Sequence, residues 1–210
     1  ASSKVSLHEE LNKEIVSSDE VYFLVSFIKM AGISQIINAL KEFTARPGTK
    51  LRILTTVYMG NTDKYAVDRL ANLKNTEVKI SYNTTTTRMH AKAYIFKRKT
   101  GFNVAFIGSS NLSKAALNDG LEWNVKLTSK DVPQVLKSVD TIYETYWNSD
   151  DFEKYDPNDE KCSKKLEEAL KIANKQTTPS IKTLFALKPF PYQNEILAQL
   201  EAERTYNHNF

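Results

Sequence analysis

The first half of the chain alternates between two kinds of apolar pattern, and this alternation restricts the possible folds more than any other feature. Val21–Ile28 and Leu51–Tyr58 are dense in β-branched and aromatic residues, which is typical of buried strands. Apolar residues at helical spacing follow each run, across 33–40 and Tyr65–Leu73, before a shorter strand-like run at Val78–Tyr82. This order predicts an α/β fold in which helices cover a parallel or mixed sheet.

A hairpin pattern replaces this alternation in the middle of the chain. Ala91–Phe96 and Phe102–Ile107 have strand character and are joined by the basic segment Lys97–Gly101, so they are predicted to pair antiparallel. Leu121–Leu127 alternates apolar and polar residues and predicts a further strand, and a helix is predicted over 131–147. Three aromatic residues of this strand and helix are expected in the core: Trp123, Tyr143 and Tyr146.

Composition limits the partners and the compartment. The 210 residues are 41% apolar, enough for one substantial core, and the net charge of +4 is compatible with nucleic acid without being diagnostic of it. The single cysteine, Cys162, excludes an internal disulfide, and the three histidines match no zinc-ligand spacing, so neither a metal nor a cofactor is expected. The longest apolar run, Val21–Ile28, is too short for a bilayer, and we expect a cytoplasmic protein without a membrane segment.

Two polar pairs flank the hairpin strands and carry the chemical signal of the sequence. His90 and Lys92 stand two residues apart, as do Ser109 and Asn111, so each pair shares a sheet face. An imidazole is a nucleophile and an ammonium neutralises phosphate oxygens, which predicts phosphodiester chemistry without a metal. The hydroxyl and the amide add neutral donors if the hairpin brings the pairs together. Glu122, on the next strand, is a candidate to accept a hydrogen bond from the imidazole and fix its tautomer.

Arg88 lies two residues before His90 and is predicted to add positive potential to the substrate side of the site. Each residue also has a reading without function: a lone His-x-Lys is a partly exposed strand start, and Glu122 is one solvent-facing residue of an alternating strand. The combination of pairs favours function. Catalysis is therefore assigned to His90, Lys92, Ser109, Asn111 and Glu122, and substrate binding to Arg88, Lys92, Ser109 and Asn111.

The combined pattern His90-x-Lys92, Gly108-Ser109-x-Asn111 and Glu122 resembles the signature of the phospholipase D superfamily, over a domain that spans roughly Val5 to Trp147. The resemblance implies a mixed β-sheet flanked by helices on both faces. It also implies that the histidine forms a covalent phosphohistidine intermediate, that the lysine, serine and asparagine bind the phosphate, and that no metal is required.

The chain departs from this family in two ways. The usual motif has an aspartate five residues after the lysine, where this chain has Lys97. Family members also combine two motifs, one for the nucleophile and one for the general acid, and neither His8 nor His208 begins a second copy. Single-motif members dimerise, so a homodimer with a shared active site is expected. The alternative, prompted by Lys97, is a catalytically lapsed module that binds DNA or dimerises. A lipid substrate ranks third because no membrane-docking segment is identified.

The end of the chain resembles a second family. Pro189-Phe190-Pro191-Tyr192-Gln193 is similar to the entry segment of superfamily 2 DEAD/DEAH-type helicases, which implies that Gln193 contacts adenine in the full-length protein. The Gly-rich loop ending in Gly-Lys-Ser/Thr is absent from the 210 residues, so this chain is not expected to hydrolyse ATP. Three further segments, Phe27–Lys29, Thr55–Asp63 and Gly120–Asn124, are similar to the N-terminal domain of bacterial helicases that carry a nuclease-like module.

The resemblance to these helicases implies a DNA substrate, bound through the phosphate backbone, and a helicase motor domain as partner in cis. The predicted organisation has three parts. A phospholipase D-like nuclease domain spans 1–150, a helical connector spans 151–188, and the start of a truncated helicase domain spans 189–210.

Overall fold

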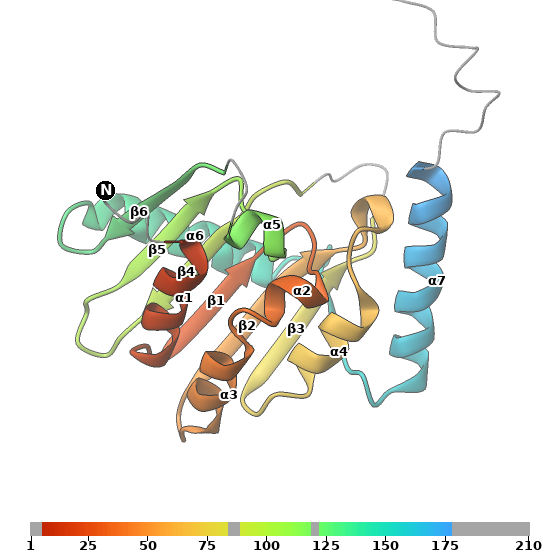
Figure 1. Cartoon of the computed structure of the whole chain (residues 1–210), viewed down its shortest axis with the longest axis horizontal. Helices are drawn as coiled ribbons and strands as arrows, with labels where there is room; N and C mark the ends of the chain where they lie inside the picture. Colours follow the sequence, from red (N-terminus) through yellow and green to blue (C-terminus); the bar gives the residue numbers. More distant parts are fainter. Residues whose placement is uncertain (1–5, 84–88, 119–121, 178–210) are drawn as a thin grey trace, which may run out of the picture. The chain divides into compact units, whose positions relative to one another are not determined.

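A seven-stranded mixed sheet organises the chain in the computed structural model, which describes residues 6–83, 89–118 and 122–177 (Figure 1). The strand order is β6-β5-β4-β1-β2-β3-β7. The strands are β1 (Glu20–Leu24), β2 (Lys50–Thr56), β3 (Thr76–Ser81), β4 (Ala93–Lys97), β5 (Val104–Gly108), β6 (Asn124–Thr128) and β7 (Glu153–Tyr155).

Parallel and antiparallel pairings divide the sheet as the sequence pattern predicts. Strands β1, β2 and β3 run parallel. The predicted hairpin is confirmed, because β4 and β5 pair antiparallel with Ala93 opposite Ile107, and β4 pairs antiparallel with β1. The α/β class with a mixed sheet is therefore confirmed.

Helices cover both faces of this sheet (Figure 1). The helical segments are α1 (Leu7–Val16), α2 (Met30–Ile33), α3 (Ile37–Ala45), η1 (Tyr58–Gly60), α4 (Lys64–Ala71), α5 (Lys114–Leu117), α6 (Pro133–Trp147) and α7 (Glu160–Thr177). Helices α2, α3 and α4 belong to the crossovers between the parallel strands, which need a connection to return the chain to the same edge.

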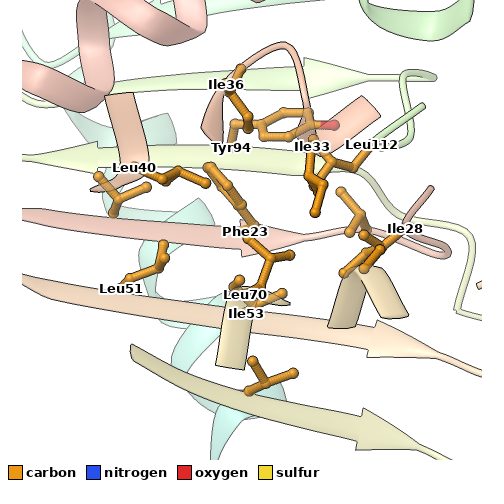
Figure 2. Close-up of a cluster of buried hydrophobic side chains, with 14 of the residues drawn as sticks. Phe23, Ile28, Ile33, Ile36, Leu40, Leu51, Ile53, Leu70, Tyr94 and Leu112 are labelled. Carbon is orange, nitrogen blue, oxygen red and sulfur yellow. The ribbon is translucent and has the colours of Figure 1, made fainter. Parts of the chain in front are cut away.

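Strand β1 shows how the period of two divides the core between these faces. Val21 and Phe23 join the larger cluster, in which side chains from the sheet meet those of α2, α3 and α4 (Figure 2). Tyr22 and Leu24 point to the other face, where α6 covers them. The ring of Tyr22 stacks on Tyr143 of α6, with centroids 4.9 Å apart. Burial of each such side chain stabilises the fold by about 1.5–3 kcal/mol.

The folded unit continues past the boundary expected at residue 150 and extends to Thr177. Residues 153–155 form β7, which pairs antiparallel with β3, and α7 places Leu166 and Leu170 in the larger core cluster. The first part of the expected connector, 151–188, is therefore packed as part of the sheet and its helical layer. Its remainder and the expected helicase segment, 189–210, lie outside the described residues.

Candidate active site

The β4–β5 hairpin brings the two polar pairs of the sequence together at one edge of the sheet. His90 and Lys92 immediately precede β4, and Ser109 and Asn111 immediately follow β5. The backbone carbonyl of Lys92 accepts a hydrogen bond of 3.2 Å from the Gly108 N–H, which joins the two segments directly. The parallel strands end at the same edge, where α/β sheets commonly bind ligands.

Lys92 is bonded to His90 through both the ring and the backbone. Its Nζ lies 2.9 Å from Nδ1 of the imidazole and donates to the His90 carbonyl oxygen at 2.6 Å. The ammonium has only donors, so Nδ1 accepts and the proton of the neutral ring lies on Nε2 in this arrangement. The histidine is exposed whereas the lysine side chain is buried, with 2% of the residue exposed. The imidazole is therefore accessible to a substrate, while the ammonium to which it is hydrogen-bonded is shielded from solvent.

Burial lowers the pKa of the Lys92 ammonium below its ordinary value, and the negative charge of Glu122 opposes part of this shift. A cation removed from water interacts more strongly with an incoming anion, because the local dielectric screens the attraction less. The lysine lines a cavity of about 240 Å³ together with Gly108 and two residues of α6, Ile142 and Tyr146. The site thus combines a desolvated positive charge with an apolar wall.

The hydroxyl of Ser109 is held by the segment that precedes β6. It donates to Oε2 of Glu122 and accepts from the Trp123 N–H at 3.1 Å. The backbone N–H of Ser109 also donates to the carbonyl oxygen of Trp123 at 3.0 Å. Within the described residues, the hydrogen-bond partner of Glu122 is therefore Ser109, whereas the expected partner is the imidazole of His90.

The glycine of the Gly-Ser-x-Asn pattern has a steric explanation. A Cβ built on Gly108 lies 1.9 Å from the carbonyl oxygen of Trp123 and 2.6 Å from Oδ1 of Asn124. Heavy atoms cannot approach this closely, so any side chain at position 108 would push β6 away from β5. Glycine therefore lets the segment at 122–124 contact Ser109.

Asn111 uses one half of its amide to fix the end of β1. Its Oδ1 accepts hydrogen bonds from the backbone N–H groups of Ser26 at 3.0 Å and Phe27 at 3.2 Å, and the residue is 7% exposed. A parallel bridge between Ile28 and Leu112 continues this contact. The Nδ2 hydrogens are the remaining donors of the side chain for a substrate oxygen.

Lys97, which stands where the family pattern has aspartate, lies at the opposite end of β4. Five residues of strand separate it from Lys92 by about 16 Å. Its Nζ forms an ion pair of 2.5 Å with Oδ1 of Asp140 on α6 and lies 4.8 Å from the centre of the Tyr22 ring. The substitution therefore affects the packing of α6 on the sheet, remote from the polar pairs.

Trp123 corrects one expectation and adds a residue to the site. The sequence predicts it in the core, but 87% of the residue is exposed. Strand β6 is the edge of the sheet, and Trp123 directly precedes its first residue, Asn124. Tyr143 is buried as expected, whereas Tyr146 is 38% exposed. Apolar alternation alone signals a side chain's face and gives no position in the strand order, so nothing in the sequence distinguishes Trp123 from a core residue.

Two of the assigned residues have no structural account. Arg88, assigned to substrate binding, and Gln193, assigned to adenine, both lie outside the described residues.

Within the described residues, no cluster of histidine, cysteine, aspartate and glutamate side chains has the arrangement of a metal site. None of the helices in the described part of the chain is long and apolar enough to cross a membrane.

The family model described as "Cardiolipin synthase, PLD-like domain" matches residues 11–147. The chain belongs to this PLD-like family. The match runs from α1 to the end of α6 and includes both polar pairs, Ser109–Asn111 and His90–Lys92.

A solved structure has the same PLD-like fold. NucT from Helicobacter pylori superposes with a TM-score of 0.53 at 24% sequence identity, and the match covers 67% of this chain and 87% of NucT. Identity at this level supports the fold alone. No curated protein matches the chain.

Proposed function

We propose that this PLD-like domain is a metal-independent phosphodiesterase that cleaves DNA through a phosphohistidine intermediate on His90. One observation carries the proposal: an exposed imidazole is hydrogen-bonded to the buried ammonium of Lys92. Ser109 follows Gly108, whose N–H donates to the Lys92 carbonyl oxygen. Nucleophile, cation and neutral donor are the groups that phosphoryl transfer needs when no metal neutralises the phosphate.

The proposed reaction has two displacements at phosphorus. A phosphate oxygen draws the ammonium of Lys92 away from Nδ1 of His90, and the ring proton moves from Nε2 to Nδ1 by exchange with water, which leaves Nε2 as the nucleophile. Nε2 bonds to phosphorus as the P–O bond to the leaving oxygen breaks, and that oxygen takes a proton from a general acid. Water then attacks the phosphohistidine, gives its proton to the conjugate base of that acid, and restores the imidazole. Ser109 and Asn111 orient the phosphate in this proposal, and Glu122 orients the Ser109 hydroxyl.

A second copy of the chain supplies the general acid in this scheme. One polar pair per chain provides one imidazole, so two His90 residues related by a twofold axis complete the site. Mixing His90→Ala protein with wild-type protein at constant total concentration, followed by subunit exchange, tests this point. A shared site loses activity with the square of the wild-type fraction, to about one quarter in an equal mixture, whereas independent sites retain about one half.

The central test is cleavage of DNA in the presence of a chelator. We expect cleavage by the wild-type chain, loss of cleavage in His90→Ala, and an acid-labile phosphoryl adduct on the wild-type enzyme during turnover. His8→Ala is the matched control, because its ring contacts the Ser6 hydroxyl at the start of α1. Binding of DNA by the wild-type chain without cleavage would favour the lapsed module instead.

We also propose that residues 189–210 begin a helicase motor in a longer protein. The resemblance of Pro189–Gln193 to the helicase entry segment supports this part of the proposal. In a protein extended through the motor, Gln193→Ala should raise KM for ATP far more than KM for other nucleoside triphosphates, because an amide recognises adenine by its donor and acceptor together. Equal effects on all nucleotides would contradict the adenine contact.

A further inference from the structure

We propose that Trp123 stacks on an unpaired nucleobase beside the scissile phosphate, so that the site selects single-stranded nucleic acid. This inference rests on the proposed function and names its substrate class. The first observation is exposure. The other tryptophan of the chain, Trp147, is 5% exposed and stacks on Tyr143, whereas Trp123 presents 87% of its surface to solvent. An indole left in water is a large apolar surface available to a flat partner.

The second observation is how firmly the backbone of this tryptophan is fixed. Two hydrogen bonds join it to Ser109, one through the Trp123 N–H at 3.1 Å and one through its carbonyl oxygen at 3.0 Å. Gly108 permits this contact, because a Cβ there would lie 1.9 Å from the same carbonyl oxygen. The backbone that carries the indole is therefore bonded to Ser109, which the proposed function assigns to phosphate binding, so little backbone ordering remains to be done when a ligand binds.

Position and chemistry together identify the partner. Because the backbone of Trp123 is bonded to Ser109, a group stacked on the indole would lie near a phosphate bound by Ser109, and a nucleotide carries a flat aromatic ring beside its phosphate. Bases of a duplex are already stacked and paired, so only an unpaired base offers its face to the indole. The contact involves no charge on the protein side, and it is tolerant of sequence because every base has a π-face.

Binding to oligonucleotides separates this contact from the catalytic step. In a His90→Ala background, which prevents cleavage, we expect Trp123→Ala to weaken binding of a single-stranded oligothymidylate about 5- to 100-fold. Binding of a duplex should change less than twofold. The preference for the base-bearing strand over an abasic strand of equal length should disappear in Trp123→Ala and return in Trp123→Phe. Val125→Ala is the matched control, since Val125 lies on β6 two residues after Trp123 and is 58% exposed.

Salt dependence gives a second readout that a loss of charge would not imitate. Trp123→Ala should leave the slope of log Kd against log salt concentration unchanged, whereas Lys92→Met should reduce it by about one counterion. Bound oligothymidylate should quench the exposed tryptophan, and the quenching should be absent in Trp123→Phe.

The outcomes distinguish this inference from the proposed function. Single-strand affinity in Trp123→Ala equal to that of the parent would overturn the stacking role even if cleavage is confirmed. A loss of dimer mass in Trp123→Ala, measured by sedimentation, would overturn it as well, because the indole would then be a subunit contact. Absence of cleavage by the wild-type chain, with base-dependent quenching retained, would contradict the phosphodiesterase and leave the base contact supported.

Discussion

Two lysines on the same strand have opposite environments. Lys92, at the start of β4, is 2% exposed, and its ammonium contacts His90 at 2.9 Å without a carboxylate in hydrogen-bond contact among the described residues. Lys97, at the end of β4, is paired with Asp140 at 2.5 Å and lies over the ring of Tyr22. In the proposed function the charge of Lys92 binds an incoming anion, whereas the charge of Lys97 is already neutralised by Asp140.

The location of Lys97 in the structure changes the meaning of the aspartate that is missing from the family pattern. The sequence makes Lys97 a reason to doubt catalysis, since the family pattern has aspartate there. In the structure the position faces α6, and an aspartate on that helix provides the opposite charge. An ion pair between strand and helix is compatible with either residue carrying the negative charge. The replacement of aspartate by Lys97 therefore affects how α6 is attached to the sheet, whereas the two polar pairs proposed for catalysis lie at the other end of β4.

Removal of Lys92 should give the largest effect and separates the two lysines most clearly. We expect Lys92→Met to lower kcat/KM for DNA cleavage by about 100- to 1000-fold, the range for loss of one donor to transition-state oxygens. Lys97→Met should change kcat/KM by less than about threefold.

The stability of Lys92→Met should not fall together with its activity. Burial lowers the pKa of Lys92, so its charged form is disfavoured in the folded state, and the free energy of unfolding at neutral pH should stay equal or rise in Lys92→Met. Urea denaturation measures this. A strongly destabilised Lys92→Met protein would show that the lysine is structural and would remove the contrast.

A charge exchange at the far end of β4 tests the role of the ion pair. Lys97→Asp restores the residue of the family pattern but places two carboxylates together, and we expect it to reduce the free energy of unfolding by about 1–2 kcal/mol. The double variant Lys97→Asp with Asp140→Lys should recover most of this loss, with cleavage close to wild type. If Asp140→Lys does not restore the free energy of unfolding, packing of Lys97 on the Tyr22 ring, and not its charge, determines the residue required at position 97.

The smallest expected effect is a displacement of the alkaline limb of the pH profile. Phosphate binding needs the charged form of Lys92, so activity is present below the pKa of this lysine and is lost as the pH rises through it. Burial places that pKa below its ordinary value of 10.5, and Glu122 raises it in part. Glu122→Gln should therefore move the limb of log(kcat/KM) to lower pH. An unchanged limb would exclude Lys92 as the titrating group.

The fold follows from the sequence where periodicity is strong. The buried runs at Val21–Ile28 and Leu51–Tyr58, the helical stripes between them and the hairpin all have long, unambiguous patterns. The strand β7 contains three residues within an acidic, turn-rich segment, which is too short for a pattern of period two to be recognised. Its membership of the sheet depends on the edge of β3, which only the tertiary structure supplies.

The candidate site, like the fold, could be predicted from the sequence only in part. The two polar pairs could be predicted because residues two apart on a strand share a face and the hairpin joins the strands. The partner of Glu122 and the exposure of Trp123 could not, because both depend on β6 being the edge strand beside β5. The reason for Gly108 is likewise tertiary, since the atom that excludes a side chain belongs to Trp123.

Strand β7 also has a consequence for how the protein can be handled. It occupies the open edge of β3, and α7 covers apolar residues of the larger cluster. A chain shortened to residue 150 would present unpaired N–H and C=O groups along β3 next to uncovered aliphatic side chains, which is a template for intermolecular sheet growth. The last strand and helix thus protect the PLD-like domain against aggregation, and any shortened version that is to remain soluble needs them.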